Sequence, residues 1–373
     1  MFAYGIFKVI YSPYKAFKEV AQNPRFIGPF LIMLLFVIAS VGRDYARASN
    51  TYVQQTLPSA LDPYNPDPWT ENCTMWVSNA NINYSHDSIL GDKSIQFTII
   101  NDTKIWAELS NIGKINCIDA EGYKNLTLRI KWIHPTAQSP KNFSLYLFST
   151  NLTEYFYCNV TEHISETKNG TWNNFTIPLG PSAEQWLGNN VQAWSNITGL
   201  KIELMWAESA RSNLTVLLDR LFFQSENFET VLNFMGGNIV ISVLSAIMGY
   251  SLYWMLFAVA TFIVARILHI KTELRIFLVI IGYALIALFI MNVLSIIFYL
   301  SIPPLYFSID SMVPISVLQS ALLFSFYISL ILPIWSIVLS FIGIHVTFSL
   351  PLSKSAAIAV IGFSPYYILF FLA

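Results

Sequence analysis

Eleven Asn-x-Ser/Thr triplets form the clearest chemical pattern in this chain. Each can accept an N-linked glycan where its Asn is exposed on the exterior or lumenal side of a membrane. All of the triplets lie in one stretch, and their acceptor residues are Asn72, Asn83, Asn101, Asn125, Asn142, Asn151, Asn159, Asn169, Asn174, Asn196 and Asn213. One triplet arises easily by chance, but this confinement predicts that the stretch is glycosylated and faces outside.

Motifs for catalysis are absent from the sequence. Its histidines show no zinc-binding spacing, and the chain contains no G-x-S-x-G, P-loop or G-x-G-x-x-G motif. Within the predicted membrane spans the only ionisable residue is His345, which we interpret as a hydrogen-bonding residue between helices. We therefore expect a non-enzymatic protein that binds no cofactor, apart from the calcium considered below, and no nucleic acid.

Aromatic and sulfur-containing residues add two further expectations. Three tryptophans have the inward parity of predicted strands (Trp132, Trp172 and Trp206), and Trp106, Trp186 and Trp194 are better candidates as platforms for stacking on sugar rings. The cysteines Cys73, Cys117 and Cys158 all lie in the predicted exterior stretch, where disulfides persist. Their number gives one bridge and one free thiol, and spacing does not decide the pair. A Cys117–Cys158 bridge would connect two mid-domain segments.

The composition indicates that one part of the chain is surrounded by water and the other by lipid. The chain is 54% hydrophobic and 12% charged, against about 25% charged residues in soluble domains. Residues 44–230 carry 12 basic and 19 acidic residues, whereas the remainder carries 9 and 3. Stretches near the length of a transmembrane helix predict five spans, at Phe26–Gly42, Asn238–Ala265, Ile276–Leu300, Pro314–Val346 and Ala356–Leu372.

Cationic residues predict the orientation of these spans. Lysines and arginines gather before the first span, between the second and third, and between the fourth and fifth, all on one side if the N-terminus is cytoplasmic. Only Arg43 and Arg47 oppose this orientation. Residues 44–230 are then extracellular on a plasma-membrane protein, or lumenal in an endomembrane. Ala46-Arg47-Ala48 would fit signal-peptide cleavage, but the apolar stretch is longer than a signal core, so we expect an uncleaved anchor.

Lys8, Lys15 and Lys18 alternate with aromatic residues at helical spacing before the first span. This pattern predicts that residues 1–25 form a cytoplasmic segment lying on the membrane interface.

The sequence of the exterior stretch predicts an all-β fold. Alternating runs predict strands at Lys93–Ile100, Asn125–Ile133, Asn142–Ser149, Glu154–Thr161, Thr171–Leu179, Gly199–Ala207 and Leu214–Gln224. In four glycosylation triplets the middle residue is apolar, so the Asn would face water while the core receives Leu126, Phe143, Phe175 and Leu214. The pattern predicts a β-sandwich over residues 74–224, reached through a linker over residues 44–73.

The exterior stretch also resembles a known family. The series "GDKSIQFTI", "YKNLTLRIKW", "TWNNFTIPLG", "WSNITGLKIELMW" and "LTVLLDRLFF" resembles the jelly-roll sandwich of carbohydrate-binding-module-like domains, with Trp172 and Asp219 at matching positions. The resemblance implies that Asp219 could help to bind a structural calcium ion, together with Asp87 or Asp92. Calcium requires six to eight oxygen ligands, and the carboxylates here are scattered.

A second resemblance covers the membrane part. "YSPYKAFKEVAQNP", "HIKTELRIFLVIIGY" and "PIWSIVLSFIGIHVTFSLPLSKSAAIAVIGF" are similar to segments of the Yip (Ypt-interacting protein) domain family of five-span membrane proteins. The resemblance implies a five-helix bundle, with spans two to five within residues 231–372. This chain departs from that family in its large exterior insertion and in Ala284-Leu285-Ile286, where the family usually has a proline.

Two functions are consistent with these patterns. The first is a non-enzymatic membrane surface protein whose glycosylated sandwich binds a glycan, a protein or a neighbouring surface-layer subunit. The second is a transporter or channel component, with the sandwich as an accessory cap. The scarcity of charged residues within the spans favours the first. Its expected partners are the lipid bilayer, a glycan or surface protein, and a further copy in an oligomer.

Overall fold

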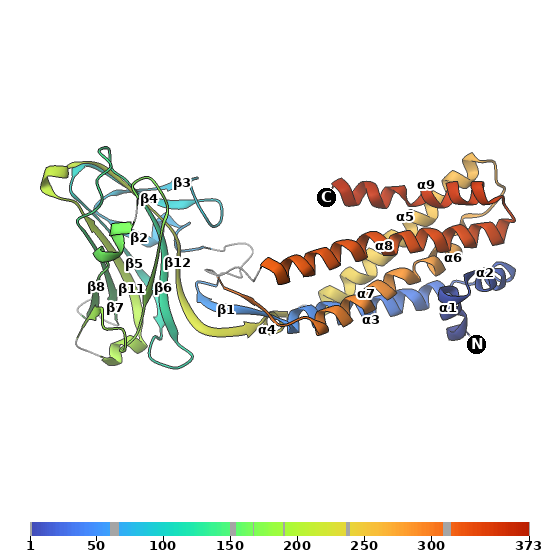
Figure 1. The fold of residues 1–373 in the computed structure, drawn as a ribbon, viewed down its shortest axis with the longest axis horizontal. Coiled ribbons are helices and arrows are strands. Elements are labelled where there is room, and N and C mark those ends of the chain that lie inside the picture. Colours follow the sequence, from blue (N-terminus) through green and yellow to red (C-terminus); the bar gives the residue numbers. More distant parts are fainter. Residues whose placement is uncertain are drawn as a thin grey trace. The chain divides into compact units, whose positions relative to one another are not determined.

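The chain divides into two compact units. A computed structural model describes residues 2–59, 67–149, 154–166, 168–188, 191–235, 239–308 and 315–372. One unit, which is mainly helical, comprises Met1–Val53 and Thr230–Ala373; the other, Gln54–Glu229, is a β-sandwich (Figure 1). The second unit coincides closely with the stretch predicted to lie outside.

Helices make up most of the first unit. They are α1 (Phe2–Tyr11), α2 (Pro13–Gln22), α3 (Ile27–Ser49), α4 (Val231–Met235), α5 (Ile239–Ile267), α6 (Leu274–Ala284), α7 (Ile286–Ser301), α8 (Ile315–Phe348) and α9 (Leu352–Leu372). A short strand, β13 (Leu305–Phe307), pairs in parallel with the first residues of β1 (Thr51–Leu57).

Three helical segments of the described chain are long and apolar enough to cross a membrane. They are Ile27–Ser49, Ile239–Ile267 and Leu274–Ser301, and the apolar helices Ile334–Phe348 and Leu352–Pro365 are shorter. These helices indicate membrane association. The third predicted span is two helices, because the chain turns at Leu285 between α6 and α7. This turn falls within Ala284-Leu285-Ile286.

Small residues allow α3 and α6 to pack closely. A Cβ added to Gly28 would lie 2.0 Å from the Tyr283 hydroxyl oxygen, and one added to Gly282 would lie 2.6 Å from Cβ of Pro29. The Trp254 indole N–H donates to the carbonyl of Leu278, with a nitrogen–oxygen distance of 2.6 Å. Close backbone approach and a polar contact between helices are the usual means of packing in a bilayer.

The predicted interfacial segment forms two helices. The chain breaks at Ser12, before Pro13, so α1 and α2 are separate. Phe17 is fully buried in the helical core, whereas Tyr11 and Tyr14 are exposed. Aromatic residues that remain exposed beside lysines suit a membrane interface.

The sandwich consists of two antiparallel sheets. The first contains β12 (Ser212–Thr230), flanked by β1, β4 (Ser94–Asp102) and β6 (Tyr123–Ile133), with β3 (Asn81–Ser85) beyond β4 and β9 (Asn173–Pro178) beyond β6. The second has the order β10 (Trp186–Leu187), β8 (Tyr155–Asn159), β7 (Asn142–Phe148), β11 (Ile197–Met205), β5 (Lys104–Ile115) and β2 (Trp76–Ser78). Short 3₁₀ helices lie at Cys73–Met75, Thr161–Glu166, Val191–Ser195 and Glu208–Ala210.

The predicted strand parity is confirmed for the core. Leu126, Phe143, Phe175 and Leu214 are all buried, as are Trp132 and Trp206. All seven predicted strands are present, although β12 is longer than expected. The predicted linker is wrong over part of its length, because α3 continues to Ser49 and β1 follows it; residues 60–66 lie outside the described chain. The sequence interpretation also missed β1, β2, β3, β5, β10 and β13.

Candidate functional site

The outer face of the second sheet carries a row of aromatic and charged side chains. Alternation along β5, β7, β8 and β11 turns their apolar residues into the core and leaves the intervening residues on the opposite face. Strand register places Lys201 opposite Tyr146, and Tyr146 opposite Tyr157. Glu203 lies opposite Trp106. We call this set, with Tyr155, Ser144 and Lys104, the sheet face.

A lysine lies between two aromatic rings at the centre of the sheet face. The Lys201 ammonium nitrogen is 5.2 Å from the ring centroid of Trp106 and 5.2 Å from that of Tyr146. Tyr146 also lies beside two further tyrosines, with centroid distances of 5.9 Å to Tyr155 and 5.2 Å to Tyr157. Both cation–π distances lie within the range that is attractive. The rings and the ammonium therefore hold one another in place.

A nearly buried carboxylate sits beside this row. The Glu203 side chain is 8% exposed, and its Oε2 lies 2.9 Å from Lys104 Nζ and 3.5 Å from Lys201 Nζ. Taking a carboxylate out of water is costly unless cations and hydrogen bonds compensate. The two ammonium groups supply that compensation, so Glu203 fixes the position of both lysines.

The phenol groups on the sheet face are hydrogen-bonding groups. Burial, with the nearby Glu203 carboxylate, raises the pKa of Tyr146, so its phenol stays neutral and can donate. Ser144 donates to the Tyr157 hydroxyl oxygen, 3.3 Å away. Flat apolar rings next to fixed polar groups are what a ligand with an apolar face and many hydroxyls requires.

One of the three predicted tryptophan platforms lies on the sheet face. Trp106 is half-buried there, on β5. The predictions for Trp186 and Trp194 are wrong, because both rings are in the core, where Trp194 stacks on Phe156 at a centroid distance of 4.0 Å. The predicted inward parity of Trp172 is also wrong: it is half-buried, and its indole N–H donates to Asp87.

The tyrosines, the lysines and Glu203 were not recognised from the sequence. The alternation of residues in two predicted strands could have identified two of these tyrosines. In the predicted strands Asn142–Ser149 and Glu154–Thr161, Tyr146 and Tyr157 alternate with core residues, and outward aromatics in neighbouring strands can form one surface.

The glycosylation acceptors are accessible wherever the structure describes them. Asn151 lies outside the described residues. None of the other ten is buried: Asn83, Asn101, Asn159, Asn174 and Asn213 are exposed, and Asn72, Asn125, Asn142, Asn169 and Asn196 are half-buried. By strand register, Asn142 and Asn159 share the outer side of the second sheet with Ser144. Glycans on these two residues would lie at one end of the sheet face.

The three carboxylates suggested for calcium do not form one ligand set. Asp87 pairs with Lys131 Nζ at 2.5 Å and accepts from Trp172 at 2.9 Å, and these contacts lower its pKa. Asp92 is exposed, and its backbone N–H donates to Glu71. In the part of the chain that the structure describes, no group of three His, Cys, Asp or Glu residues could hold a metal ion. The residues present do not fit the predicted ion.

Asp219 is instead surrounded by protein donors. Its Oδ2 accepts from the backbone N–H groups of Ile89 and Leu90, the second at 3.1 Å. Its Oδ1 accepts from the Thr70 hydroxyl at 3.4 Å and from the Arg220 N–H at 2.9 Å. These four donors occupy the positions from which carboxylate oxygens would bind a cation.

A second fully buried carboxylate, Asp67, lies beside Asp219. Its Oδ2 accepts from the same Arg220 N–H at 2.6 Å, and its Oδ1 accepts from the Thr70 N–H at 3.3 Å. Both carboxyl groups have no solvent exposure. Burial, then the negative charge of Asp219, raises the pKa of Asp67 to about 7. The pair therefore holds a proton well above the usual titration range of aspartate.

The predicted Cys117–Cys158 bridge is wrong for this structure. Cys73, Cys117 and Cys158 are free thiols. Cys158 is on β8, and Cys117 follows β5, with β7 and β11 between these strands. Three strand spacings amount to roughly 14 Å, whereas bridged cysteines have Cα atoms about 4.4–6.8 Å apart. Burial raises the pKa of Cys117 to about 12 and that of Cys158 to about 11, so both thiols stay protonated at neutral pH.

One Ser–His contact resembles part of a catalytic arrangement. Ser212 Oγ lies 3.0 Å from His134 Nε2. That nitrogen also lies 2.9 Å from the Ala210 carbonyl oxygen, while Nδ1 accepts from the Thr136 N–H at 3.2 Å. The proton must therefore be on Nε2, which leaves no lone pair there to take the serine proton. The contact is structural.

Comparisons with known proteins give partial structural matches only. No family model and no curated protein matches the chain. Similar solved structures include a carbohydrate-binding module of the β-sandwich superfamily described as promiscuous in specificity, at 13% identity and a TM-score of 0.28; the match covers 40% of this chain and 57% of that chain. A family 30 module of a Clostridium thermocellum cellulase matches at 11% identity and a TM-score of 0.30, over 41% of this chain and 92% of that one.

A third similar structure is a family 11 module from Clostridium thermocellum in complex with a β-1,3-1,4-mixed-linked tetrasaccharide. It matches at 12% identity and a TM-score of 0.29, over 43% of this chain and 93% of that one. At these TM-scores the likeness assigns neither a ligand nor a residue role. Function must be argued from the geometry of the site.

Proposed function

We propose that this chain is a non-enzymatic integral membrane protein whose β-sandwich binds a glycan chain on the sheet face. The observation that carries the proposal is the Trp106–Lys201–Tyr146 row, extended by Tyr157. Sugar rings present an apolar C–H face and a rim of hydroxyls. Aromatic rings match the first, while Lys201 and the Glu203 carboxylate match the second.

The dimensions of the row favour a chain over a single sugar. Trp106 and Tyr157 lie on strands that are three places apart in the sheet, which corresponds to roughly 14 Å. Both lysines beside the row lie next to carboxylates: Lys104 and Lys201 contact Glu203, and strand register places Glu108 opposite Lys201. A site with balanced charge favours a neutral oligosaccharide over a strongly anionic one.

Replacement of Trp106 by Ala is expected to weaken glycan binding about 5- to 30-fold, because truncation of an aromatic anchor commonly costs about 1–2 kcal/mol. The measurement is binding of the purified protein to an array of neutral oligosaccharides, followed by titration of the best ligand with wild type and variant. Tyr146→Ala should give a similar loss.

Tyr84→Ala is the matched control for these variants. Tyr84 is an exposed tyrosine on β3, which belongs to the other sheet. Its replacement should leave glycan affinity unchanged. Equal losses in all three variants would contradict the assignment, as would binding that survives the double replacement of Trp106 and Tyr146.

The proposal also covers the placement of the chain. We propose five spans, a cytoplasmic N-terminus and an exterior sandwich in the plasma membrane, as the distribution of cationic residues predicts. The accessible acceptor residues support an exterior sandwich. The protein purified from its native membrane should therefore exceed the 42.3 kDa of the bare chain, and enzymatic deglycosylation should reduce it to that mass.

Mass spectrometry of tryptic glycopeptides assigns the occupied acceptors. Asn174 and Asn83 are exposed, and they should be occupied. An unmodified chain with a mass of 42.3 kDa from a glycosylating host would contradict the exterior placement.

A further inference from the structure

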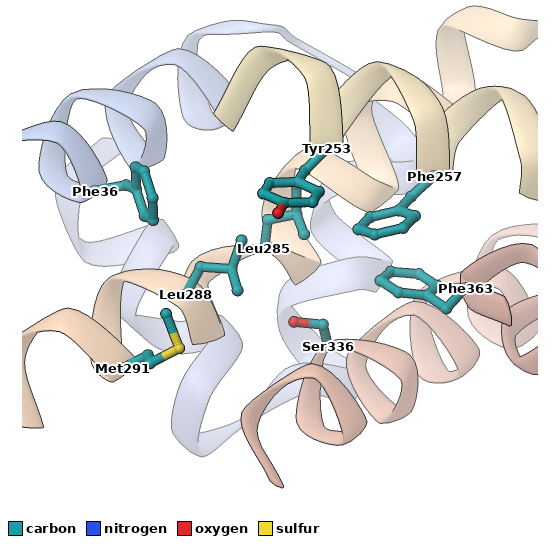
Figure 2. A pocket seen from close by; sticks show the side chains of 8 residues that line it. All are labelled: Phe36, Tyr253, Phe257, Leu285, Leu288, Met291, Ser336 and Phe363. Carbon is teal, nitrogen blue, oxygen red and sulfur yellow. The ribbon is translucent and has the colours of Figure 1, made fainter. Parts of the chain in front are cut away.

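A small apolar cavity lies within the helical unit, where α6 ends and α7 begins. Its volume is roughly 100 Å³, and it is lined by Phe36, Tyr253, Phe257, Leu285, Leu288, Met291, Ser336 and Phe363 (Figure 2). An engineered cavity of about 150 Å³ can hold a benzene ring. This cavity is therefore large enough for the end of one alkyl chain.

One polar side chain at the inner end of the cavity has no hydrogen-bond partner among the described residues. Ser336 is 1% exposed, and its Oγ has no hydrogen-bond partner among the described residues. Figure 2 shows this hydroxyl pointing into the cavity, between Leu288 and Phe363. Ser340 on the same helix instead donates to the Ser336 carbonyl at 2.7 Å. A hydroxyl left unpaired in an apolar setting costs free energy, which a ligand oxygen would recover.

The other end of the cavity is accessible from the side of α5. Tyr253 is 37% exposed, while Leu285, Phe363 and Ser336 at the inner end are each 1% exposed. Leu252 and Met248, farther around α5, are strongly exposed, so Tyr253 lies at the edge of the exposed side of this helix. Since α5 is long and apolar enough to cross a membrane, this side of the helix faces lipid.

We propose that this cavity binds a single-chain, oxygen-bearing lipid from the bilayer, of the long-chain alcohol or ester class. Its oxygen accepts a hydrogen bond from Ser336, and the adjoining methylene groups contact Leu288, Phe257 and Phe363. The rest of the chain leaves past Tyr253 into the surrounding lipid. The apolar lining selects an alkyl chain, and the unpartnered Ser336 hydroxyl selects a ligand with a hydrogen-bonding oxygen.

Photolabelling of the full chain in lipid nanodiscs tests the proposal. The probe is hexadecanol with a diazirine in its chain, and the second probe is the same molecule without the hydroxyl. We expect the alcohol to label peptides that line the cavity. Leu288→Trp fills the cavity and should reduce this labelling at least fivefold. Ser336→Ala should reduce labelling by the alcohol about fivefold, the effect of one hydrogen bond, and leave labelling by the alkane unchanged.

Two variants serve as matched controls. Leu294→Trp changes an exposed residue on α7, the helix that also carries Leu288. Ser340→Ala removes a buried hydroxyl whose hydrogen bond lies within α8. Both should label as wild type. The proposal is overturned if cavity peptides are not labelled, as expected when water alone satisfies Ser336. It is also overturned if Ser336→Ala affects both probes equally; this variant decides the matter even if Leu288→Trp does not fold.

Discussion

Replacement of Asp67 by Asn is expected to stabilise the sandwich at pH 8 by up to about 4 kcal/mol. The folded state raises the pKa of Asp67 from 3.8 to about 7, chiefly through burial. Each pKa unit corresponds to about 1.4 kcal/mol. The associated stability is fully present below pH 3.8 and is lost as the pH rises from 3.8 through 7, because the unfolded state ionises over this range while the folded state keeps its proton.

Urea unfolding of residues 54–229, which form a unit with their own core, measures this effect from pH 4 to pH 8. Loss of one acceptor in the Asn variant should cost roughly 1 kcal/mol, whereas wild type loses only about 0.5 kcal/mol of the Asp67 contribution by pH 4. The variant should therefore be slightly less stable than wild type at pH 4 and more stable by about 3 kcal/mol at pH 8. Glu121→Gln changes an exposed acid, and it should leave the wild-type profile unchanged.

The same measurement, repeated with calcium, distinguishes neutralisation of the two carboxylates by a proton from neutralisation by a cation. If 1 mM Ca²⁺ abolished the loss of stability at pH 8 and a chelator restored it, a cation and not a proton would neutralise Asp67 and Asp219. The four donors that surround Asp219 lead us to expect no such dependence.

The periodicity of apolar residues in the sequence was sufficient to predict most of the fold. Leu126, Phe143 and Phe175 are core residues in strands found by alternation, which is a local property of each strand. The same alternation is present in "KIWAELSNI", where Ile105 and Leu109 are buried and Trp106 is not. This segment is β5, which was overlooked although it carries a main residue of the sheet face.

Contacts between distant segments could not be predicted in this way. The hydrogen bond from Thr70 to Asp219 joins residues 149 positions apart, and Asp67 precedes a short 3₁₀ helix with no periodic pattern. Only the folded chain brings these two carboxylates together. Trp186 and Trp194 illustrate the same limit, because the sequence does not reveal that both rings are buried, with Trp194 stacked on Phe156 and Trp186 edge-on to Trp194.

Replacement of Trp132 by Ala is expected to destabilise the sandwich by about 3–5 kcal/mol, the usual cost of removing a buried aromatic side chain. Trp132 on β6 is completely buried. Trp132→Phe should cost much less than this. Its indole Nε1 has no hydrogen-bond partner among the described residues, and an unpaired buried donor costs about 1–3 kcal/mol. Phenylalanine removes the unpaired donor, which stabilises the fold, and removes part of the buried ring, which destabilises it, so the two effects oppose each other.

Trp76→Phe is the matched comparison, since Trp76 is also buried but its indole N–H donates to the Trp69 carbonyl at 2.7 Å. The Phe variant there loses both volume and a hydrogen bond, and leaves a buried carbonyl unpaired. Denaturant unfolding of residues 54–229 should therefore rank the loss of stability as Trp132→Ala, then Trp76→Phe, then Trp132→Phe. A larger loss for Trp132→Phe than for Trp76→Phe would show that the Trp132 indole N–H does have a partner in the folded protein.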